Sequence, residues 1–199
     1  IINLGEFSRT DNKLKLTLTQ NGNVSADKQV DMGVFEINGK NYRLIFAKSN
    51  LTKDGLAANE YDYGDYFAWG AIKPWYTEID KTISPWTATW EKSGGYNSTN
   101  APFYNSSTGS YTTYTPGDAL EASDDAAHVI LGGDWQIPTK AIWVDLTKHC
   151  KYLCSWNSDR KGYVFNNNYQ TLFLPAAGYV RTTKFYNVGQ LGYYWSGIA

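Results

Sequence analysis

Hydrophobic and polar residues alternate over much of the first fifty residues with the period of two that is typical of half-buried β-strands. Within the run 13–20, leucine occupies every second position from 14 to 18, and an Asn-Gly turn signal follows at 21–22. Residues 34–37 and 40–47 are apolar and β-prone, and the Asn-Gly pair between them is a strong hairpin signal. This pattern predicts that antiparallel strands dominate the first part of the chain.

Periodicity is lost in the middle of the chain. Residues 61–70 are a dense aromatic block broken by glycines. These rings would either stack on sugar rings or fill a core poor in aliphatic side chains, and we favour a loop that packs them inward. Residues 71–117 are rich in Trp, Tyr, Ser, Thr, Asn and Gly and show little periodicity, which predicts a long ordered loop region with short strands. Long loops of this kind are often functional.

Two helices are expected next. In the first, Ser123 is a good N-cap, Asp124 and Asp125 fall in the first turn, where carboxylates complement the helix dipole, and the glycine pair at 132–133 ends the helix.

The second helix is expected to begin with Thr139 as its N-cap. Trp143, Leu146 and Cys150 then lie at i, i+3 and i+7 and share one buried face. Residues 151–170 predict a loop and hairpin, and residues 170–174 predict a buried strand. The fold class predicted from these elements is α+β, with antiparallel strands, two helices and long ordered loops.

Composition narrows the functional classes. The chain has 199 residues, of which 42% are hydrophobic, so it is most simply one domain with a small N-terminal extension. Its net charge of -1 gives no basic field for nucleic acid or anionic lipid, and no apolar run approaches the roughly 18 residues that span a bilayer. Aromatic residues make up 16% and charged residues only 19%, a neutral, polar and aromatic chemistry common on secreted and surface proteins.

Residues that could carry out catalysis or bind a metal are few. His128 and His149 each fall late in a predicted helix, where histidine usually complements the dipole. Asp62 and Asp65 could form a glycosidase-like carboxylate pair, but aspartates in such loops more often cap turns. The Asn run at 166–168 could offer oxygens to calcium, although a turn is the simpler interpretation.

The two cysteines, Cys150 and Cys154, lie four residues apart. If a helix ends between them they could form a local disulfide, and otherwise they are two partly buried thiols. With no second cysteine pair and only two histidines, we expect no metal and no cofactor.

The last thirty residues combine two kinds of side chain. One kind looks suited to a packed core: Leu172, Leu174, Pro175, Ala176, Ala177 and Trp195. The other kind looks suited to solvent: Arg181, Lys184, Phe185, Tyr186, Asn187, Gln190 and Tyr193. Rigid aromatics beside adaptable polar groups on a glycine-punctuated loop are typical of a recognition surface.

Five motifs follow one another in a specific order. They are the stretches 63–70 (Tyr-Gly-Asp-Tyr-Phe-Ala-Trp-Gly), 124–128, 132–139 (Gly-Gly-Asp-Trp-Gln-Ile-Pro-Thr), 174–179 (Leu-Pro-Ala-Ala-Gly-Tyr) and 192–196 (Gly-Tyr-Tyr-Trp-Ser). This series resembles the Fibrobacter succinogenes major paralogous domain, which is abundant in surface proteins of Bacteroidetes. The resemblance covers roughly residues 31–199 and leaves the first thirty residues as an extra β hairpin, an attachment segment or the end of a preceding domain.

The resemblance implies a C-type lectin-like fold related to the formylglycine-generating-enzyme group. The same fold carries the variable proteins of diversity-generating retroelements, in which the C-terminal segment presents mutable residues on a fixed scaffold. Carried over, Tyr194 and Trp195 would be scaffold, and Ile198 would be a weaker candidate for display. The display positions would be Arg181, Thr183, Lys184, Phe185, Tyr186, Asn187, Gln190, Leu191 and Tyr193. The calcium-binding motifs of sugar-binding C-type lectins and the active-site motifs of the enzymatic relatives do not occur.

We therefore expect a non-catalytic binding or adhesion module, outside the cell or on its surface, or alternatively on a phage virion. Its partner would be a protein or glycan on another cell or surface, with no nucleic acid and no direct membrane insertion. Two alternatives stay open. One is an enzyme, either an oxidase of the formylglycine-generating type or a protein acting on carbohydrate through Asp62 and Asp65. The other is a structural tip subunit of a pilus or phage fibre, with residues 1–30 as the attachment segment.

Overall fold

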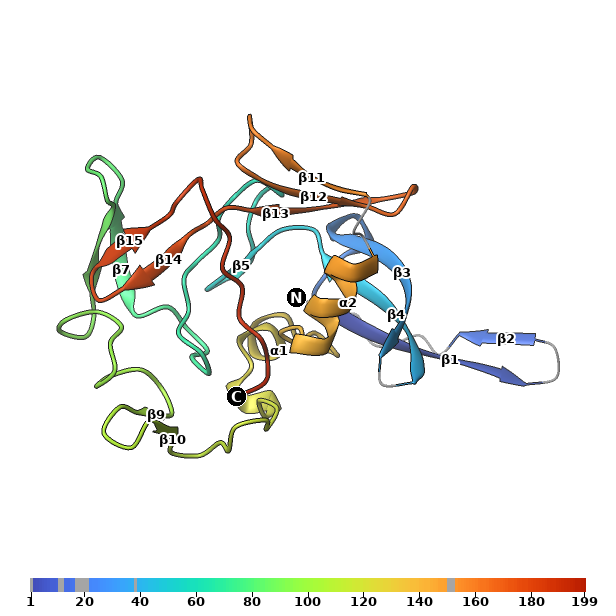
Figure 1. Cartoon of the computed structure of the whole chain (residues 1–199), viewed down its shortest axis with the longest axis horizontal. Helices are drawn as coiled ribbons and strands as arrows, with labels where there is room; N and C mark the ends of the chain where they lie inside the picture. The colour runs from blue at the N-terminus through green and yellow to red at the C-terminus, as the bar shows by residue number, and fades with distance from the viewer. Residues whose placement is uncertain (1, 11–12, 17–21, 38, 150–152) are drawn as a thin grey trace.

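The computed structural model describes residues 2–10, 13–16, 22–37, 39–149 and 153–199. Within these ranges the chain forms several mostly antiparallel sheets and two α-helices, joined by long ordered loops (Figure 1). The α+β class predicted from the sequence is therefore confirmed. No helix among the described residues is both long enough and apolar enough to cross a bilayer.

The first sheet has four strands in the order β2-β1-β4-β3. Its strands are β1 (Ile2–Thr10), β2 (Lys13–Leu16), β3 (Gln29–Ile37) and β4 (Lys40–Ala47), with a short 3-10 helix at Ala26–Lys28 before β3. The predicted β3–β4 hairpin is confirmed, because Ile37 pairs with Lys40 across the turn. The strand predicted at 13–20 is confirmed as far as Leu16, and residues 17–20 lie outside the described residues.

Residues 1–30 were predicted to be a separate N-terminal extension. In the structure β1 pairs along β4, and β1 and β2 continue outward as a hairpin (Figure 1). Val24 and Val30 are both buried among residues of the main domain. The last residues of the predicted extension thus contribute to the main core, and the division at residue 30 stays a prediction.

The main core lies between helix α2 (Lys140–His149) and the sheet formed by β3 and β4 (Figure 1). Ile142 and Leu146 of α2 are almost completely buried and pack in one cluster with Phe46 of β4. The predicted N-cap is confirmed, because the Thr139 hydroxyl accepts a hydrogen bond from the Ile142 amide at 3.4 Å. Leu146 was correctly predicted to face the core and Trp143 packs at its edge, whereas Cys150 lies outside the described residues.

The first helix begins later than predicted. Residues Ala122–Asp124 form a separate 3-10 turn, and α1 spans Ala126–Leu131. Its N-cap is Asp125, not Ser123, because the buried Asp125 carboxylate accepts hydrogen bonds from the Ala127 and His128 amides. The helix ends at Gly132 with φ +69°, as the glycine pair predicted.

A second sheet of three strands also contributes to the main core, through Phe165 and Leu172. Its strands are β11 (Cys154–Asn157), β12 (Gly162–Asn166) and β13 (Thr171–Pro175), in sequence order. The hairpin predicted within residues 151–170 is confirmed, because β11 pairs with β12, and the predicted strand at 170–174 is confirmed, because Leu172 and Phe173 are buried in β13.

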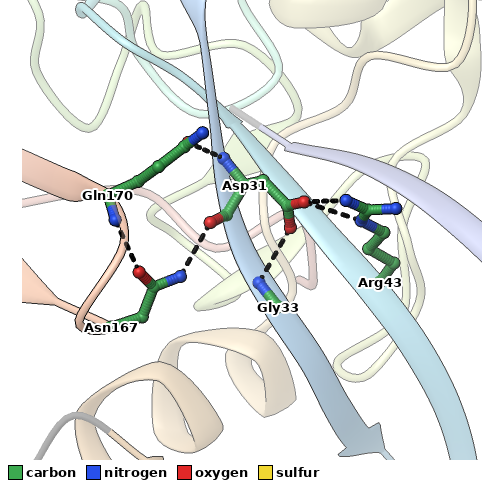
Figure 2. Close-up of polar contacts among 5 residues, drawn as sticks. All are labelled: Asp31, Gly33, Arg43, Asn167 and Gln170. Carbon is green, nitrogen blue, oxygen red and sulfur yellow. Dashed lines mark hydrogen bonds and ion pairs between the residues drawn. The ribbon is translucent and has the colours of Figure 1, made fainter.

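Polar contacts join this second sheet to the first, and Figure 2 shows them. A β-bulge after Asp31 turns its main chain toward the β12–β13 turn, where its amide donates to Gln170 Oε1 at 2.6 Å. The Asp31 carbonyl accepts from Asn167 Nδ2 at 2.8 Å. The Asp31 carboxylate binds Arg43 and the Gly33 amide. The side chains of Gln170 and Asn167 thus bind the main-chain groups of Asp31 that a neighbouring β-strand would otherwise pair with.

The remaining strands are short and belong to the long loops. They are β5 (Leu51–Thr52), β6 (Gly55–Leu56), β7 (Tyr76–Asp80), β8 (Thr87–Trp90), β9 (Tyr104–Asn105), β10 (Ser110–Tyr111), β14 (Tyr179–Arg181) and β15 (Lys184–Tyr186). The prediction of short strands within 71–117 is confirmed. The C-terminal segment was expected to be a glycine-punctuated loop, and this was wrong for residues 179–186, because β14 and β15 form a hairpin in a sheet of order β14-β15-β8-β7.

Candidate functional site

The C-terminal hairpin is anchored by the segment that precedes it. The Gly178 amide donates to the Leu191 carbonyl at 2.8 Å, and the Gly189 amide donates to the Ala176 carbonyl at 2.7 Å. Gly178 has φ +69°, and a Cβ placed on it would lie 2.1 Å from the Tyr186 carbonyl oxygen. Only glycine fits there, so the Ala-Ala-Gly stretch holds the loop 187–191 against the hairpin.

Phe185, predicted to face solvent, is a core residue. Only 1% of its surface is exposed, and its ring meets the edge of Tyr66 with centroids 4.8 Å apart and lies 6.2 Å from Trp86. The reason is the period of two in β15, which turns Lys184 and Tyr186 outward and the residue between them inward. Phe185 is therefore removed from the candidate site.

The other predicted display positions are mostly accessible. Thr183 and Asn187 are half-buried, as is the weaker candidate Ile198. The exposed positions are Arg181, Lys184, Tyr186, Gln190, Leu191 and Tyr193. The hairpin register places Arg181 directly opposite Lys184 at its tip.

The structure brings three aromatic rings together on this surface, and we call Tyr179, Tyr186 and Tyr193 the tyrosine cluster. Tyr179 stacks on Tyr186 with centroids 5.4 Å apart and meets Tyr193 edge-on at 4.9 Å. Asn187 Nδ2 donates to the Tyr193 hydroxyl at 3.3 Å. Sequence reasoning missed Tyr179, which it treated as the end of a scaffold motif; its place opposite Tyr186 becomes visible only with the strand register.

Trp195, expected to be a buried scaffold residue, is 53% exposed. Its ring is nevertheless held in place, because Trp195 Nε1 donates to the Phe67 carbonyl at 2.8 Å. Its own carbonyl accepts from Trp143 Nε1 at 3.0 Å. Trp69 Nε1 donates to the Ser196 carbonyl at 2.9 Å. The main chain of this segment is thus scaffold as expected, while the Trp195 ring faces solvent.

Tyr194 behaves as the scaffold residue that was predicted. It is half-buried, and its hydroxyl donates to the Pro175 carbonyl at 2.7 Å. Burial raises the pKa of Tyr194 and that of Tyr66 well above the ordinary value for tyrosine. Both phenols therefore stay protonated near neutral pH and keep their roles as donors, Tyr66 to the Ala177 carbonyl at 2.6 Å.

A groove of about 850 Å³ runs between the C-terminal segment and the loops. Its lining includes Trp195 and the tyrosine-cluster members Tyr179 and Tyr193 from the C-terminal segment, and Tyr104 and Tyr111 from the β9–β10 hairpin. Asp65 is the only charged residue among the described residues that line the groove. Its carboxylate is already engaged, accepting from the Tyr76 hydroxyl at 2.8 Å and from the Lys53 amide at 2.7 Å.

A smaller hollow of about 420 Å³ contains Asp62 and Asp65 together with Lys81. Asp62 Oδ2 accepts from both the amide and the side-chain nitrogen of Asn59, at 3.1 and 2.9 Å. Asp62 therefore caps the turn of its own loop, and Asp65 binds the Lys53 amide in the turn between β5 and β6, so their interpretation as turn-capping residues is confirmed.

The remaining candidates for metal or thiol chemistry are placed as follows. His128 lies in the last turn of α1, as predicted, and the side chain of His149 lies outside the described residues. Asn168 has φ +72°, and its amide donates to Asn166 Oδ1, so this stretch is the expected turn. Cys154 lies in β11 and Cys150 outside the described residues, so their pairing stays a prediction. Within the described ranges, no three His, Cys, Asp or Glu side chains are placed to hold a metal ion.

No family model matches the chain, and neither the curated proteins nor the solved structures provide a match.

The motifs that carry the family resemblance contact one another in space. Tyr66 of the first motif binds Ala177 of the fourth, and Trp69 binds Ser196 of the fifth. Asp125 of the second motif accepts from the Ile137 amide of the third at 2.8 Å. These separate segments of the chain thus form one frame that supports the C-terminal surface.

Proposed function

We propose that this protein is a non-catalytic recognition module with a C-type lectin-like fold, whose C-terminal surface binds a protein or glycan ligand. The proposal places it outside the cell, on a bacterial surface or on a phage virion. Its binding surface comprises the tyrosine cluster, Leu191 and the polar positions Arg181, Lys184 and Gln190.

The observation that carries this proposal is the contrast between adjacent residues of the hairpin. Phe185 packs inward on Tyr66, while its neighbours Lys184 and Tyr186 face solvent. Tyr186 and Tyr193 are then exposed on a backbone that hydrogen bonds already hold. Tyrosines fixed in this way contribute a large contact area at a low cost in conformational entropy, as in other recognition surfaces.

The polar residues extend the same surface. Arg181 and Lys184 lie opposite each other at the hairpin tip, and no ion pair joins either of them to another described residue. Long cationic side chains at the rim of an apolar patch steer and orient a partner, while the central aromatic residues provide most of the affinity.

We further propose that the exposed positions are the ones a diversity-generating retroelement would vary. Neighbouring DNA tests this directly, because such an element places a reverse transcriptase and a near-copy of the C-terminal coding segment beside the gene. In this proposal the codons that differ between the gene and the near-copy are those of exposed residues such as Tyr186 and Tyr193. Codons for Phe185 and Gly178 would not vary, because Phe185 is buried in the core and a side chain at Gly178 would clash with the Tyr186 carbonyl.

The binding proposal is tested with the whole chain on arrays of surface proteins and glycans. The test variant replaces Tyr186, Leu191 and Tyr193 together with Ala, and the control is Tyr169→Ala. Tyr169 is 93% exposed in the β12–β13 turn, at the end of that sheet directed away from β14 and β15 (Figure 1).

We expect the wild-type protein and the control to bind the same ligand, and the triple variant to lose binding while it unfolds at a similar temperature. Equal binding by all three proteins would contradict the proposal. Loss of binding in an Asp62→Asn, Asp65→Asn variant alone would instead favour the carbohydrate-active alternative.

A further inference from the structure

The groove beside the C-terminal surface has walls made largely of aromatic rings from distant parts of the chain. Tyr104 meets Tyr111 edge-on with centroids 5.6 Å apart, and Tyr111 in turn lies 4.8 Å from Trp69. Tyr193 and Trp195 are both 53% exposed along the C-terminal side. The groove therefore offers exposed aromatic rings from two separate segments of the chain.

The charge of the lining restricts what the groove binds. No Lys or Arg occurs among the described lining residues, and the single carboxylate, Asp65, already has two hydrogen-bond donors. A phosphate, sulfate or carboxylate group would lose hydration there without meeting a cation. An ammonium or guanidinium group would find no unengaged carboxylate. A neutral ligand fits this lining best.

The lining also offers hydrogen bonds beside its rings. The phenol oxygens of Tyr104, Tyr111 and Tyr179 make no hydrogen bond to another group in the described part of the chain. Each is a neutral donor and acceptor next to an aromatic face. A ligand that presents both apolar faces and hydroxyl groups would use the rings and the phenols together.

Trp195 is the best-prepared stacking surface in the groove. The hydrogen bond from its Nε1 to the Phe67 carbonyl fixes the ring while more than half of the residue stays exposed. A ring held in this way loses little freedom when a ligand stacks on it, so more of the contact energy appears as affinity.

Binding of a peptide as an additional β-strand along β14, the edge strand of its sheet, is disfavoured. Gly178 is bridged there by Gly192, and Thr182 is bridged by Tyr96. The main-chain positions that a peptide strand would need at both ends of β14 are therefore occupied by the chain itself.

We propose that the groove binds a neutral oligosaccharide. One of its sugar rings stacks on Trp195, and hydroxyl groups of the oligosaccharide form hydrogen bonds with the phenols of Tyr104, Tyr111 and Tyr179. This inference rests on the proposed recognition function and names the ligand class of the groove, which shares Tyr179 and Tyr193 with the proposed surface. Pyranose rings combine an apolar C–H face with neutral hydroxyls at their edges, the combination that the lining offers. The groove needs no calcium ion for this mode of binding.

The test measures binding of the whole chain to short cello-, manno-, xylo- and galacto-oligosaccharides. Galacturonate and sulfated oligosaccharides serve as charged counterparts, and EDTA is present throughout. Affinity is followed by the change in tryptophan fluorescence and by calorimetry. The variants are Trp195→Ala and, in the separate β9–β10 hairpin, Tyr104→Ala; the control is Trp156→Ala, an exposed indole in β11 that does not line the groove.

We expect binding of at least one neutral series, weakened about ten-fold or more by Trp195→Ala and also by Tyr104→Ala, and unchanged by the control. If Trp195→Ala does not fold, Tyr104→Ala alone decides, because it removes an exposed ring from a separate hairpin. Preference for the charged sugars, or unchanged neutral binding in both variants, would overturn the inference. Binding to arrayed proteins but to no sugar would overturn it and leave the recognition function standing, whereas absence of any binding partner would count against both.

Discussion

The opposite orientations of Phe185 and Tyr186 give the sharpest test of the proposed surface. The two residues are adjacent in β15, are both aromatic and differ in exposure, 1% against 37%. We compare Phe185→Ala with Tyr186→Ala, so that each substitution serves as the control for the other. If our description is right, the first removes core packing and the second removes a binding contact.

The expected magnitudes follow from the contacts. Phe185→Ala leaves a cavity between Tyr66 and Trp86, and such truncations of buried phenylalanine cost about 3–5 kcal/mol. For a domain of this size that corresponds to a fall in Tm of about 6–20 °C. Tyr186→Ala loses mainly the stack on Tyr179, and an aromatic pair contributes about 0.5–1.5 kcal/mol. Its Tm should therefore fall by no more than about 6 °C.

The assay is thermal unfolding followed by near-ultraviolet circular dichroism, repeated in urea to obtain free energies of unfolding. Binding to whichever ligand the wild-type protein selects is measured well below both transitions. We expect Tyr186→Ala to weaken binding and Phe185→Ala to preserve it wherever the protein is folded. Equal destabilisation by the two substitutions, or a Phe185→Ala protein as stable as wild type, would refute the assignment of inward and outward faces.

Substitutions at three further positions test contacts that hold the fold together. Asp125→Ala leaves three amides without their acceptor and should lower the free energy of unfolding, measured in urea titrations, by about 2–4 kcal/mol. Asp125→Asn should lower it by less. Equal stability of the wild type and both variants would contradict the capping role of Asp125. Gly178→Ala forces a Cβ against the Tyr186 carbonyl, so we expect a lower Tm together with weaker ligand binding, and an unchanged Tm would show that the loop adjusts freely. Burial opposes ionisation of Asp31, but the hydrogen bonds from Arg43 and from the Gly33 amide, together with the charge of Arg43, outweigh it and hold the pKa of Asp31 below its usual value. The stabilisation from this lowered pKa is complete above the unfolded-state pKa of about 4 and is lost as the pH falls below it. The Tm difference between wild type and Asp31→Asn should therefore shrink as the pH is lowered from 7 into the acid range. A Tm difference that does not depend on pH would contradict the ion pair.

Turn residues and helix caps in the sequence correctly predicted elements whose structure depends on neighbouring residues in the chain. The Asn-Gly pair produced the β3–β4 hairpin, and Thr139 produced the start of α2. Ser123 was the wrong N-cap because three consecutive residues before α1, Ser123, Asp124 and Asp125, each have a side chain that could cap the helix. The actual cap is Asp125, whose carboxylate also binds the amide of Ile137, twelve residues later.

The errors at the candidate site have a different cause. A strand of three residues is too short to show a period, so nothing local indicated that Phe185 faces inward. Its burial depends on Tyr66, more than one hundred residues earlier in the chain. Trp195 likewise looked like a core residue by type, and only the long-range bond to Phe67 shows that its ring is fixed yet exposed.

The hydrogen bonds that hold the C-terminal segment come from main-chain amides and from buried or anchored aromatics, not from the side chains of Arg181, Lys184, Gln190 or Leu191. Sequence change at these four positions therefore leaves the supporting backbone contacts intact. For the experimenter, this makes the protein a candidate starting point for combinatorial libraries, in which new binders are selected by randomising a few codons without re-engineering stability each time.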